Sequence, residues 1–508
     1  MAERRTDRPR AGAPVDRRTS VAGLAAGLLM SVAPGARAAG PSVRLVPGAP
    51  ALNLGNYDLG KLGYRVDECF LTGVARSYQP LAPFAEDGVW PAAPDASAPF
   101  TTRLVAVRPL GAATFNGAVM VEWLNVSGGA DAGADWLMTH RELLRGGFAY
   151  VGVSAQKVGI DGGRSSLGPG SHALKAADPA RYGELTHPGD DFSFDIFSQA
   201  GRAVRDLGVL GGLRPRRLLA AGESQSSLFL TTYVNAIDPL ARVYDGFLIH
   251  SRGALAPALQ GNFYGDAQKA MPPAVKIRPD VRAPVMMVLT ELDVTNFLAA
   301  RQPDGERIRT WEIPGAAHAD VYMLAVSRMD SGQADIPALA AAWAPTRDTS
   351  GGKLTLPMNA APQHHYVLSA AVKALDTWVE HGRTPAHGPL IDVQPGPPGG
   401  TPDFLGRGAA AVVARDADGN AVGGIRTPWI DVPTATLSGQ GNSGAPLARL
   451  VGSTVAFDPT RLARLYPGGK ADYLGRFRAA LDRSIAAGFI LAADRAEILA
   501  LAAAMYPS

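Results

Sequence analysis

The sequence predicts an α/β fold in which a mostly parallel sheet is covered by helices on both faces. Short apolar runs alternate with helical patterns through the middle of the chain, and this alternation is typical of strand–helix–strand units. The apolar runs show little alternation with polar residues, as expected for strands that are buried on both faces. The 58 glycines and 40 prolines among 508 residues indicate many turns rather than long bundled helices.

Six strands and four helices of this sheet are predicted in chain order. The strands are expected at 118–126, 148–155, 216–224, 244–251, 283–290 and 307–315. The helices are expected where apolar residues recur at helical spacing, at 134–147, 192–208, 225–237 and 366–382. Glycines stop the first and the last of these helices, and an Asp-Pro pair ends the third.

The two flanks of this region have different patterns. Residues 43–108 are rich in strand-forming residues and are expected to form an antiparallel flank. Within 395–508 we expect a hairpin at 412–426, with its turn at Asp-Gly-Asn. Two helical patterns follow it, at 471–487 and 491–505.

The first 38 residues have the organisation of an export signal. An arginine-rich stretch precedes the apolar run Val21–Val32, and the small-residue site Ala36-Arg37-Ala38 follows it. The apolar run is too short to span a bilayer. Arg17-Arg18 stand just before it, as in twin-arginine signals, but the residues after the pair differ from that signal, so the Sec route stays open. The expected location is periplasmic or secreted, the alternative being an unstructured basic leader.

The Pro/Gly-rich run 392–402 is the best candidate for a domain boundary. The sequence therefore predicts an export signal at 1–38, a catalytic domain at 39–394, and an extension at 395–508 that packs on the catalytic domain. Long insertions in the catalytic domain are candidates for a lid: 154–191, 251–283 and 319–365.

Charge and cysteine content exclude several classes of site. The formal charge is +3, but residues 1–38 hold seven arginines against three acidic residues, so the rest of the chain has 42 basic and 43 acidic side chains. A nucleic-acid partner therefore loses its electrostatic support. The single cysteine, Cys69, rules out an internal disulfide and a multi-cysteine metal site. We expect no metal ion, no organic cofactor and no membrane span.

A candidate nucleophile lies between a predicted strand and a predicted helix, in the sequence Gly222-Glu223-Ser224-Gln225-Ser226. This is the arrangement of a nucleophile elbow, a turn so tight that the positions two before and two after the serine need small side chains. Gly222 and Ser226 meet that requirement. The alternative is an ordinary strand-to-helix turn in which Ser224 caps the helix.

Serine needs a base to take its proton, and His318 is the best candidate among the nine histidines. It follows the predicted strand 307–315, behind Pro314-Gly315, and comes later than both the elbow and the candidate acids. His250 also ends a strand, but it precedes the acids, so we expect it at most to line the pocket. The remaining candidates are expected in helices or in the loop before the last helix: His140, His381, His364 and His365.

Two carboxylates follow the strand at 283–290, and either could fix the tautomer of the histidine. Asp293 is favoured because it lies two residues further beyond the strand than Glu291. Glu291 would then brace the loop or pair with an arginine such as Arg301. The alternative acid is Glu291 itself.

An oxyanion needs backbone N–H donors. Gln225, at the start of the helix after the elbow, is expected to give the first. The glycine-rich loop 125–129 after the strand VEWLN is expected to give the second, from Asn125 or Val126. The alternative is that 125–129 is a plain loop at the end of a strand.

Several stretches of the chain resemble a known family, and they lie in order over most of residues 43–508: VEWLNVSGG, YGELTHPGDDFSFDIFSQAGRAVR, AAGESQSS, TELDV, RQPDGERIRTWEIPGAAHADVY, WVEHGRTP and GNAVGGIRTPWIDVP. The chain resembles the α/β-hydrolase superfamily, and more narrowly a group of bacterial proteins labelled only as alpha/beta hydrolase domain proteins. The resemblance implies an α/β-hydrolase fold with a triad of Ser224, Asp293 or Glu291, and His318. Relatives often read TETDV in place of TELDV, so both carboxylates recur and the resemblance does not choose between them.

These features favour an exported serine hydrolase that cleaves a small to medium apolar carboxylic ester through an acyl-enzyme. An amidase, a peptidase or a polyester depolymerase would use the same triad. An inactive periplasmic binding protein on the same fold is the alternative of another class, and the presence of serine, acid and histidine in the right chain order disfavours it. The expected partner is a small-molecule ester, and the sequence leaves the oligomeric state open.

Overall fold

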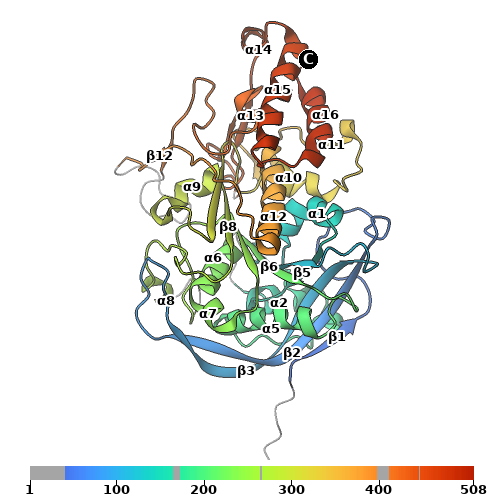
Figure 1. The fold of residues 1–508 in the computed structure, drawn as a ribbon, viewed down its shortest axis with the longest axis vertical. Helices are drawn as coiled ribbons and strands as arrows, with labels where there is room; N and C mark the ends of the chain where they lie inside the picture. The colour runs from blue at the N-terminus through green and yellow to red at the C-terminus, as the bar shows by residue number, and fades with distance from the viewer. Residues whose placement is uncertain are drawn as a thin grey trace, which may run out of the picture. The chain divides into compact units, whose positions relative to one another are not determined.

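The computed structural model, which describes residues 40–163, 172–261, 263, 266–349, 351–397, 411–445 and 447–507, contains one large central sheet (Figure 1). The predicted export signal lies outside the described residues. The sheet has nine strands: β1 (Ser42–Val46), β2 (Tyr64–Pro80), β3 (Ala92–Pro109), β4 (Ala118–Trp123), β5 (Ala149–Val153), β6 (Arg217–Glu223), β7 (Gly246–His250), β8 (Val285–Thr290) and β9 (Ile308–Ile313).

The strand order β1-β2-β3-β5-β4-β6-β7-β8-β9 separates an antiparallel flank from a parallel core. The strands from β5 to β9 are parallel to one another, with Val121 of β4 opposite Val151 of β5 and Ala220 of β6. Strands β1, β2 and β3 pair antiparallel, and β3 joins β5 antiparallel. The mostly parallel sheet predicted from the sequence is therefore confirmed, and so is the antiparallel flank at its edge.

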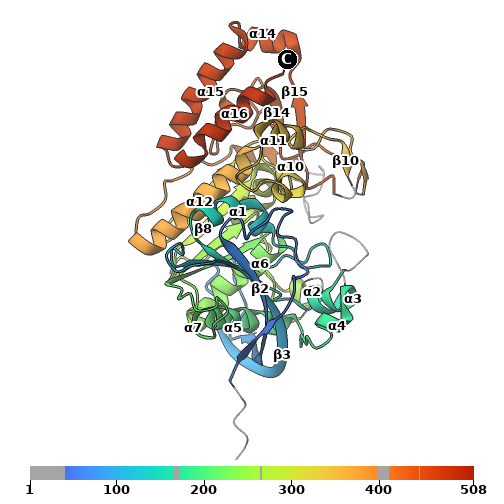
Figure 2. The ribbon, with the colours of Figure 1, turned by 90° about the vertical axis from the view of Figure 1, so that its right-hand side faces the viewer.

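Helices cover both faces of the parallel strands (Figure 2). Alternate residues of β4 enter two different hydrophobic clusters: Met120 packs with α1 (Ala134–Arg145) and α12 (Gln363–His381), whereas Val121 packs with α5 (Ser193–Asp206) and α6 (Gln225–Thr232). Successive side chains of a strand point to opposite faces, so the two clusters are the cores of the two faces. This explains why the strands lack polar alternation.

The remaining described elements lie in the insertions and in the C-terminal part. The helices there are α2 (Lys157–Asp161), α3 (Leu174–Ala177), α4 (Pro179–Tyr182), α7 (Asp238–Ala241), α8 (Asp266–Lys269), α9 (Glu291–Phe297), α10 (Val321–Leu324), α11 (Ile336–Ala342), α13 (Pro428–Asp431), α14 (Pro459–Leu465), α15 (Gly469–Ala486) and α16 (Arg495–Met505). The short strands pair as β10 (Asp348–Thr349) with β11 (Gly352–Lys353), β12 (Val393–Gln394) with β13 (Val412–Val413), and β14 (Ala435–Ser438) with β15 (Ser453–Ala456). Short 3-10 or π turns complete the list: Asp190–Phe192, Tyr233–Ile237, Leu298–Ala300, Val326–Arg328 and Ala492–Asp494.

The expected hairpin in the C-terminal part is present in a short form. Strand β13 pairs with β12, and the antiparallel bridge Arg415–Ala421 closes the turn together with the backbone hydrogen bonds from Val422 N to Ala414 O (2.9 Å) and from Asp416 N to Asn420 O (2.8 Å). The Asp416 side chain accepts hydrogen bonds from the N–H groups of Asp418 and Asn420 and so stabilises the turn. The two predicted helices correspond to α15 and α16, which lie with α14 at the top of both views (Figures 1 and 2).

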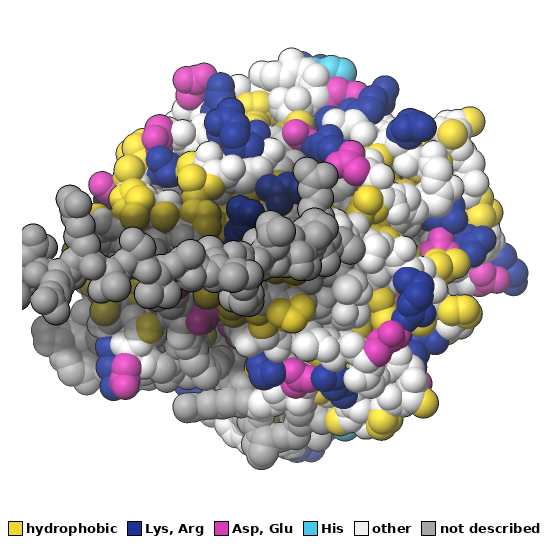
Figure 3. Space-filling model, turned by 90° about the horizontal axis from the view of Figure 1, so that it is seen from below, with side chains coloured by type: hydrophobic (Ala, Val, Ile, Leu, Met, Phe, Trp, Pro, Cys, Tyr) yellow, Lys and Arg dark blue, Asp and Glu magenta, His cyan; other side chains and the backbone are white. Residues whose placement is uncertain are grey.

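The surface on the side of β2 and β3 carries basic and acidic side chains interspersed with hydrophobic ones (Figure 3). Exposed hydrophobic residues of this flank include Leu45 and Val74. Among the described residues, no helix combines the length and the apolar character that crossing a membrane requires.

Candidate active site

Ser224 stands between the end of β6 and the start of α6, in the backbone conformation φ 56° and ψ −121°. A positive φ is strained for a residue with a Cβ, and such strain is typical of functional turns. The turn is held by Ser226, whose Oγ donates to Glu223 O (2.8 Å) and accepts from Glu223 N (3.0 Å). A Cβ at Gly222 would lie 3.0 Å from the carbonyl of Ser226, which explains the glycine two residues before Ser224.

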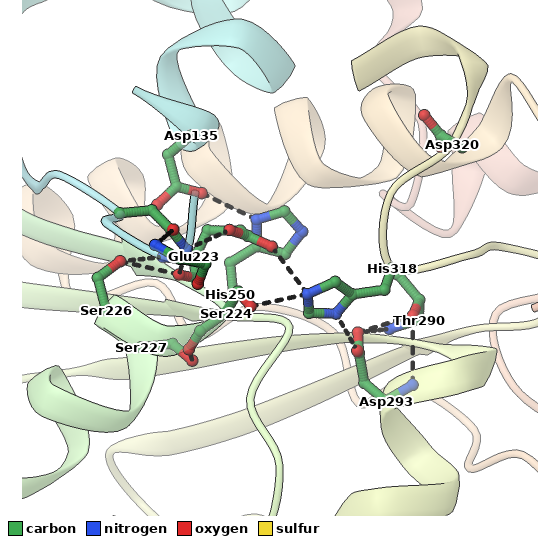
Figure 4. Close-up of polar contacts among 12 residues, drawn as sticks. Asp135, Glu223, Ser224, Ser226, Ser227, His250, Thr290, Asp293, His318 and Asp320 are labelled. Atoms are coloured by element: carbon green, nitrogen blue, oxygen red, sulfur yellow. Dashed lines mark hydrogen bonds and ion pairs between the residues drawn. The ribbon is translucent and has the colours of Figure 1, made fainter. Parts of the chain in front are cut away.

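Three of the residues singled out from the sequence form one line of hydrogen bonds (Figure 4). The Nε2 of His318 lies 2.8 Å from Ser224 Oγ, and its Nδ1 lies 2.6 Å from Asp293 Oδ1. An ionised carboxylate only accepts hydrogen bonds, so Nδ1 carries a proton, and in the neutral ring Nε2 is left to accept from the serine hydroxyl. The three residues come from the ends of β6, β8 and β9.

Asp293 owes its position to the start of α9. Thr290 caps this helix, and its N–H and Oγ1 both donate to Asp293 Oδ2, at 2.8 and 2.7 Å. This is a capping box, and it leaves Oδ1 for His318. Burial alone would raise the pKa of Asp293, but His318 and the donors of Thr290 outweigh burial and hold that pKa below its ordinary value. The segment after β8, expected as a loop, is therefore a helix from its first residue.

Glu291 has a different task. Its Oε1 accepts from Arg415 Nη2 (2.6 Å), Ser438 Oγ (3.0 Å) and Gly439 N (3.0 Å), and its Oε2 accepts from Gly315 N (2.8 Å). Its Oε1 thus joins α9 to the C-terminal part of the chain, and its Oε2 joins α9 to the loop between β9 and His318.

The expected pairing of Glu291 with Arg301 is wrong. The Nε and Nη2 of Arg301 bind the two carboxylate oxygens of Glu312, at 3.0 and 2.7 Å. Arg415, which lies 124 residues after Glu291 in the chain, takes that place instead.

Glu223 is a residue of the site that the sequence reasoning missed as a functional group. Its Oε1 lies 3.4 Å from His318 Nε2, on the same side of the ring as Ser224 Oγ, and its Oε2 accepts from Asn125 Nδ2 (3.1 Å). Burial raises the pKa of Glu223 to about 8, although His318 lowers it. The signal that could have found it is a glutamate directly before the nucleophile, at the end of an otherwise apolar strand.

His318 is surrounded by these two carboxyl groups. Burial lowers its pKa, but Asp293 and, to a lesser extent, Glu223 raise it, so the pKa of His318 reaches about 9. An imidazole held in this way favours its charged form. The arrangement suits a base that must hold a proton during a reaction.

The predicted oxyanion donors are only partly in place. Gln225 is the first residue of α6 and lines the cavity described below. The N–H of Asn125 donates to Ala132 O at 3.0 Å, so the prediction that it binds an oxyanion is wrong: the 125–129 loop closes on itself. Val126 is buried and is not among the described residues that line the cavity. The side chain of Asn125 instead binds Glu223.

Ser224 and His318 open onto a cavity of about 740 Å³. Its apolar walls come from α1, from the two insertions at 251–283 and 319–365, and from the C-terminal part: Leu137, Phe263, Met323, Leu447, Leu450 and Val451. Ala319 N donates to Leu450 O at 3.0 Å, which ties the loop of His318 to that C-terminal wall. The described residues of the third insertion, 154–191, contribute no lining residue.

Two of the other histidines do not lie where the sequence predicted. His364 and His365 lie in α12 and are buried, so the prediction of a loop before the last helix is wrong by a few residues: the helix starts at Gln363. His140 is buried in α1, and His381 ends α12 in an exposed position. Among the described residues, no group of three or more His, Cys, Asp or Glu is arranged to hold a metal ion.

The chain is similar to a known protein family and to several solved structures. The chain matches the family model described as "Alpha/beta hydrolase domain" over residues 32–500. A comparison with curated proteins gave no match. Similar solved structures include a thermostable esterase from Pseudomonas putida, at 14% identity and a TM-score of 0.26, with 47% of this chain and 66% of that chain covered.

Two further solved structures are similar to this chain. Acetyl xylan esterase 1 from Thermoanaerobacterium sp. has 9% identity and a TM-score of 0.29, with 54% of this chain and 82% of that chain covered. A putative dienelactone hydrolase from Klebsiella pneumoniae subsp. pneumoniae has 13% identity and a TM-score of 0.26, with 48% and 87% covered. Because the family model spans nearly the whole sequence, the chain belongs to the alpha/beta hydrolase domain family.

Proposed function

We propose that this hydrolase is a serine esterase that cleaves carboxylic esters through an acyl-enzyme, with Ser224 as nucleophile, His318 as base and Asp293 as the acid that orients His318. The observation that carries the proposal is the continuous line Ser224 Oγ–His318 Nε2–His318 Nδ1–Asp293 Oδ1, with distances of 2.8 and 2.6 Å. Such a line makes a weak nucleophile reactive.

In the first half of the reaction His318 Nε2 takes the Ser224 proton while Oγ attacks the carbonyl carbon of the ester. The negative charge that develops on the carbonyl oxygen needs N–H donors. Gln225 is the first residue of α6, so its N–H has no acceptor within the helix and is available for that oxygen. His318 then passes its proton to the leaving alcohol, and the acyl group stays on Ser224.

In the second half a water molecule replaces the alcohol. His318 takes a proton from that water, which attacks the acyl carbon, and then returns the proton to Ser224 Oγ as the acid leaves. Asp293 stabilises the imidazolium in both halves. Its second oxygen is held by Thr290, so the ring keeps one orientation throughout.

The cavity indicates the kind of ester. Its volume of about 740 Å³ and its apolar wall residues suit a small to medium apolar substrate, since pockets of this kind gain affinity from burial of apolar surface. An amide, a peptide bond or a polyester would meet the same triad, so amide and polyester substrates are compared with simple esters.

A fluorophosphonate probe tests the nucleophile directly. We expect the purified protein to be labelled, Ser224→Ala to be unlabelled, and Ser127→Ala, which changes another serine that lines the cavity, to be labelled like the unaltered protein. Esters of graded acyl length, matched anilides and a soluble polyester then define the bond. An unlabelled native protein would contradict the proposal and favour a binding protein on this fold.

We also propose that the protein is exported. The arginine-rich start, the apolar run Val21–Val32 and the Ala36-Arg37-Ala38 site support it. N-terminal sequencing of protein recovered from the periplasm or the medium is expected to begin at Ala39. A sequence beginning at the initiator methionine, or protein confined to the cytoplasm, would contradict it.

A further inference from the structure

Beside the candidate triad, four buried side chains from four different elements form a second hydrogen-bonded line. His250 Nδ1 at the end of β7 lies 2.9 Å from Asp135 Oδ1 in α1, and His250 Nε2 lies 2.9 Å from His364 Nε2 in α12. His364 Nδ1 lies 2.9 Å from Asp320 Oδ2, just before α10. All four side chains are fully buried. We call Asp135, His250, His364 and Asp320 the buried Asp–His–His–Asp chain.

The contact between the two histidines fixes the number of protons in this chain. Two imidazole nitrogens come within 2.9 Å of each other only when one of them carries a proton, because two facing lone pairs repel and so do two facing N–H groups. Each contact with a carboxylate also holds one proton. The chain therefore contains three protons in its three contacts, and its net charge is −1.

This count does not depend on which atom holds each proton. Burial raises the pKa of Asp135 to about 8, so the proton between Asp135 and His250 can belong to either of them. Burial and the neighbouring His364 hold the pKa of His250 well below its ordinary value. A fourth proton would have to go to an atom such as Asp135 Oδ2, which is buried and has no hydrogen-bond partner among the described residues.

Two members of the buried Asp–His–His–Asp chain, His250 and Asp320, are joined to the backbone of the candidate triad. The N–H of Ser224 donates to His250 O at 3.0 Å, so His250 holds the backbone of the strained elbow. Asp320 follows His318 by two positions, and its Oδ1 accepts from Met323 N at 2.9 Å at the start of α10. Figure 4 shows Asp135 and His250 beside Glu223 and Ser224.

We propose that the buried Asp–His–His–Asp chain positions the catalytic serine and histidine relative to each other, with His364 as its central positioning residue. The proposal rests on the serine-hydrolase function proposed above. The elbow belongs to β6 and the His318 loop follows β9, with two strands between them, so a link between β7 and the His318 loop sets the distance that proton transfer requires. A misplacement of about 1 Å can cost about 10²-fold in rate.

The charge of the chain also reaches the triad. Titratable groups face the chain from six surrounding segments: Glu122 of β4, Tyr150 of β5, Glu223 of β6, Asp293 of α9, His318 of the loop after β9, and His365 of α12. A buried charge of −1 near His318 adds to the effect of Asp293 and favours the imidazolium. Breaking the chain is therefore expected to change the pH dependence of the reaction as well as its rate.

The next residue in the same helix gives a matched control. His365 is buried like His364, but it stacks on Tyr322 with a centroid distance of 3.9 Å, and neither of its ring nitrogens has a hydrogen-bond partner among the described residues. His365→Phe keeps this stacking and leaves the chain intact. His364→Gln keeps a polar group that can reach His250 but cannot also reach Asp320.

The experiment compares His364→Gln and His365→Phe with the unaltered protein in ester hydrolysis, fluorophosphonate labelling and thermal unfolding. We expect His364→Gln to lower kcat between about 10-fold and 100-fold with little change in KM. We also expect it to slow labelling by a similar factor. The variant keeps both carboxylates but loses an imidazole and the protons in its contacts, so the charge of the chain becomes −2 and the acid side of the pH profile should move to higher pH. His365→Phe should leave kcat and the pH profile unchanged.

Proton NMR tests the proton count of the chain directly. The proton between the two Nε2 atoms should give a far-downfield signal that is present in the unaltered protein and in His365→Phe and absent in His364→Gln. A native protein without that signal would overturn the proton count. Folded His364→Gln with native kcat and pH profile would overturn the positioning role.

Two further outcomes are distinguished in advance. If the unaltered protein neither hydrolyses esters nor reacts with the probe, the proposed serine-hydrolase function is wrong, and the positioning role of the chain is wrong with it. If His364→Gln does not fold, Asp320→Asn replaces it, because asparagine can still accept from Met323 N but removes the carboxylate that His364 faces. Native kcat and a native pH profile in folded Asp320→Asn would then overturn the proposal.

Discussion

Among the described residues, histidine Nδ1 atoms meet buried carboxylates in two places, at His318 in the candidate triad and at His250 and His364 in the buried Asp–His–His–Asp chain. The two places differ at the other ring nitrogen. His318 binds Asp293 at 2.6 Å, and its Nε2 faces Ser224 Oγ at the edge of the cavity. His364 binds Asp320 at 2.9 Å, and its Nε2 faces His250 where both rings are fully buried. Both places thus share a carboxylate on Nδ1, and at His318 the other ring nitrogen faces a hydroxyl group, whereas at His364 it faces a second imidazole.

The two places also differ in their electrostatics. At His318 the carboxyl groups of Asp293 and Glu223 outweigh burial, so the pKa rises to about 9. At His250 burial and a neighbouring histidine lower the pKa well below its ordinary value. One ring is thus prepared to hold an additional proton beside a hydroxyl, and the other shares a proton that it already has. The predictions below test this difference.

The largest effect is expected from removing the Ser224 hydroxyl, which lies beside His318 and has no counterpart in the buried Asp–His–His–Asp chain. Ser224→Ala should lower ester turnover about 10⁴-fold or more, since the other members of a triad act only through the nucleophile. Thermal unfolding should show that the fold is kept. Near-native turnover by the folded variant would show that Ser224 is not the nucleophile.

The next effect concerns the carboxylate of the first place. Asp293→Asn should lower turnover about 10³–10⁴-fold, because the imidazole loses the partner that fixes its tautomer. Steady-state kinetics with a short-chain ester measures this loss. Asp320 cannot replace the lost carboxylate, because it contacts Nδ1 of His364 and not Nδ1 of His318.

Glu291→Gln is the matched control for Asp293→Asn. Glu291 binds Arg415, Gly439 and Gly315, so its loss should lower the free energy of unfolding by about 1–3 kcal/mol while changing turnover much less. A larger loss of turnover for Glu291→Gln than for Asp293→Asn would show that the acid has been assigned to the wrong residue.

The pH dependence of kcat/KM is the third test. His318 accepts the serine proton only when its Nε2 is free, and its pKa is raised to about 9. Activity should therefore rise about tenfold per pH unit from neutral pH and level off above about pH 9. A pH–rate profile measured with a neutral ester tests this, and a plateau already reached at pH 7 would contradict it.

Stability should change with pH in the opposite direction. A histidine whose pKa is raised on folding from 6.5 to about 9 contributes stability that is fully present below pH 6.5 and is lost as the pH rises through 9. Chemical denaturation at pH 6.5 and pH 9.5 measures this contribution. His318→Gln should reduce the difference between the two values.

The sequence was sufficient for those parts of the site that follow from local geometry. Ser224 directly follows β6, Asp293 comes three residues after the end of β8, and His318 comes five residues after the end of β9. Parallel strands bring their carboxyl ends to one edge of a sheet. What could not be predicted depends on pairs that lie far apart in the chain. His250 and His364 are separated by 114 residues, and Glu291 and Arg415 by 124.

Two local predictions failed for other reasons. The N–H of Asn125 was expected to face an oxyanion, but a bridge to Ala132 uses it, and nothing in the loop sequence distinguishes these two outcomes. The helix that contains His364 begins at Gln363, a few residues earlier than apolar spacing alone suggests. Side chains expected in a loop are therefore buried in α12.

The smallest effect is expected at Glu223, whose Oε1 lies 3.4 Å from Nε2 of His318. Its pKa is raised to about 8, so at pH 7 the carboxyl group is neutral and glutamine imitates it. Glu223→Gln should therefore match the native rate at pH 7 within about threefold. Above pH 8 the native protein gains a carboxylate that keeps His318 protonated, whereas the variant does not.

Its pH–rate profile should accordingly level off earlier, by less than about one pH unit, since Asp293 is the larger cause of the raised pKa of His318. Profiles of Glu223→Gln and the native protein, measured side by side from pH 6 to pH 10, decide the point. If Glu223→Gln loses turnover at pH 7 as severely as Asp293→Asn, then Glu223 and not Asp293 is the essential carboxyl partner of His318. The difference between His318 and His364 would then lie in what their Nε2 atoms face and not in their carboxylate partners.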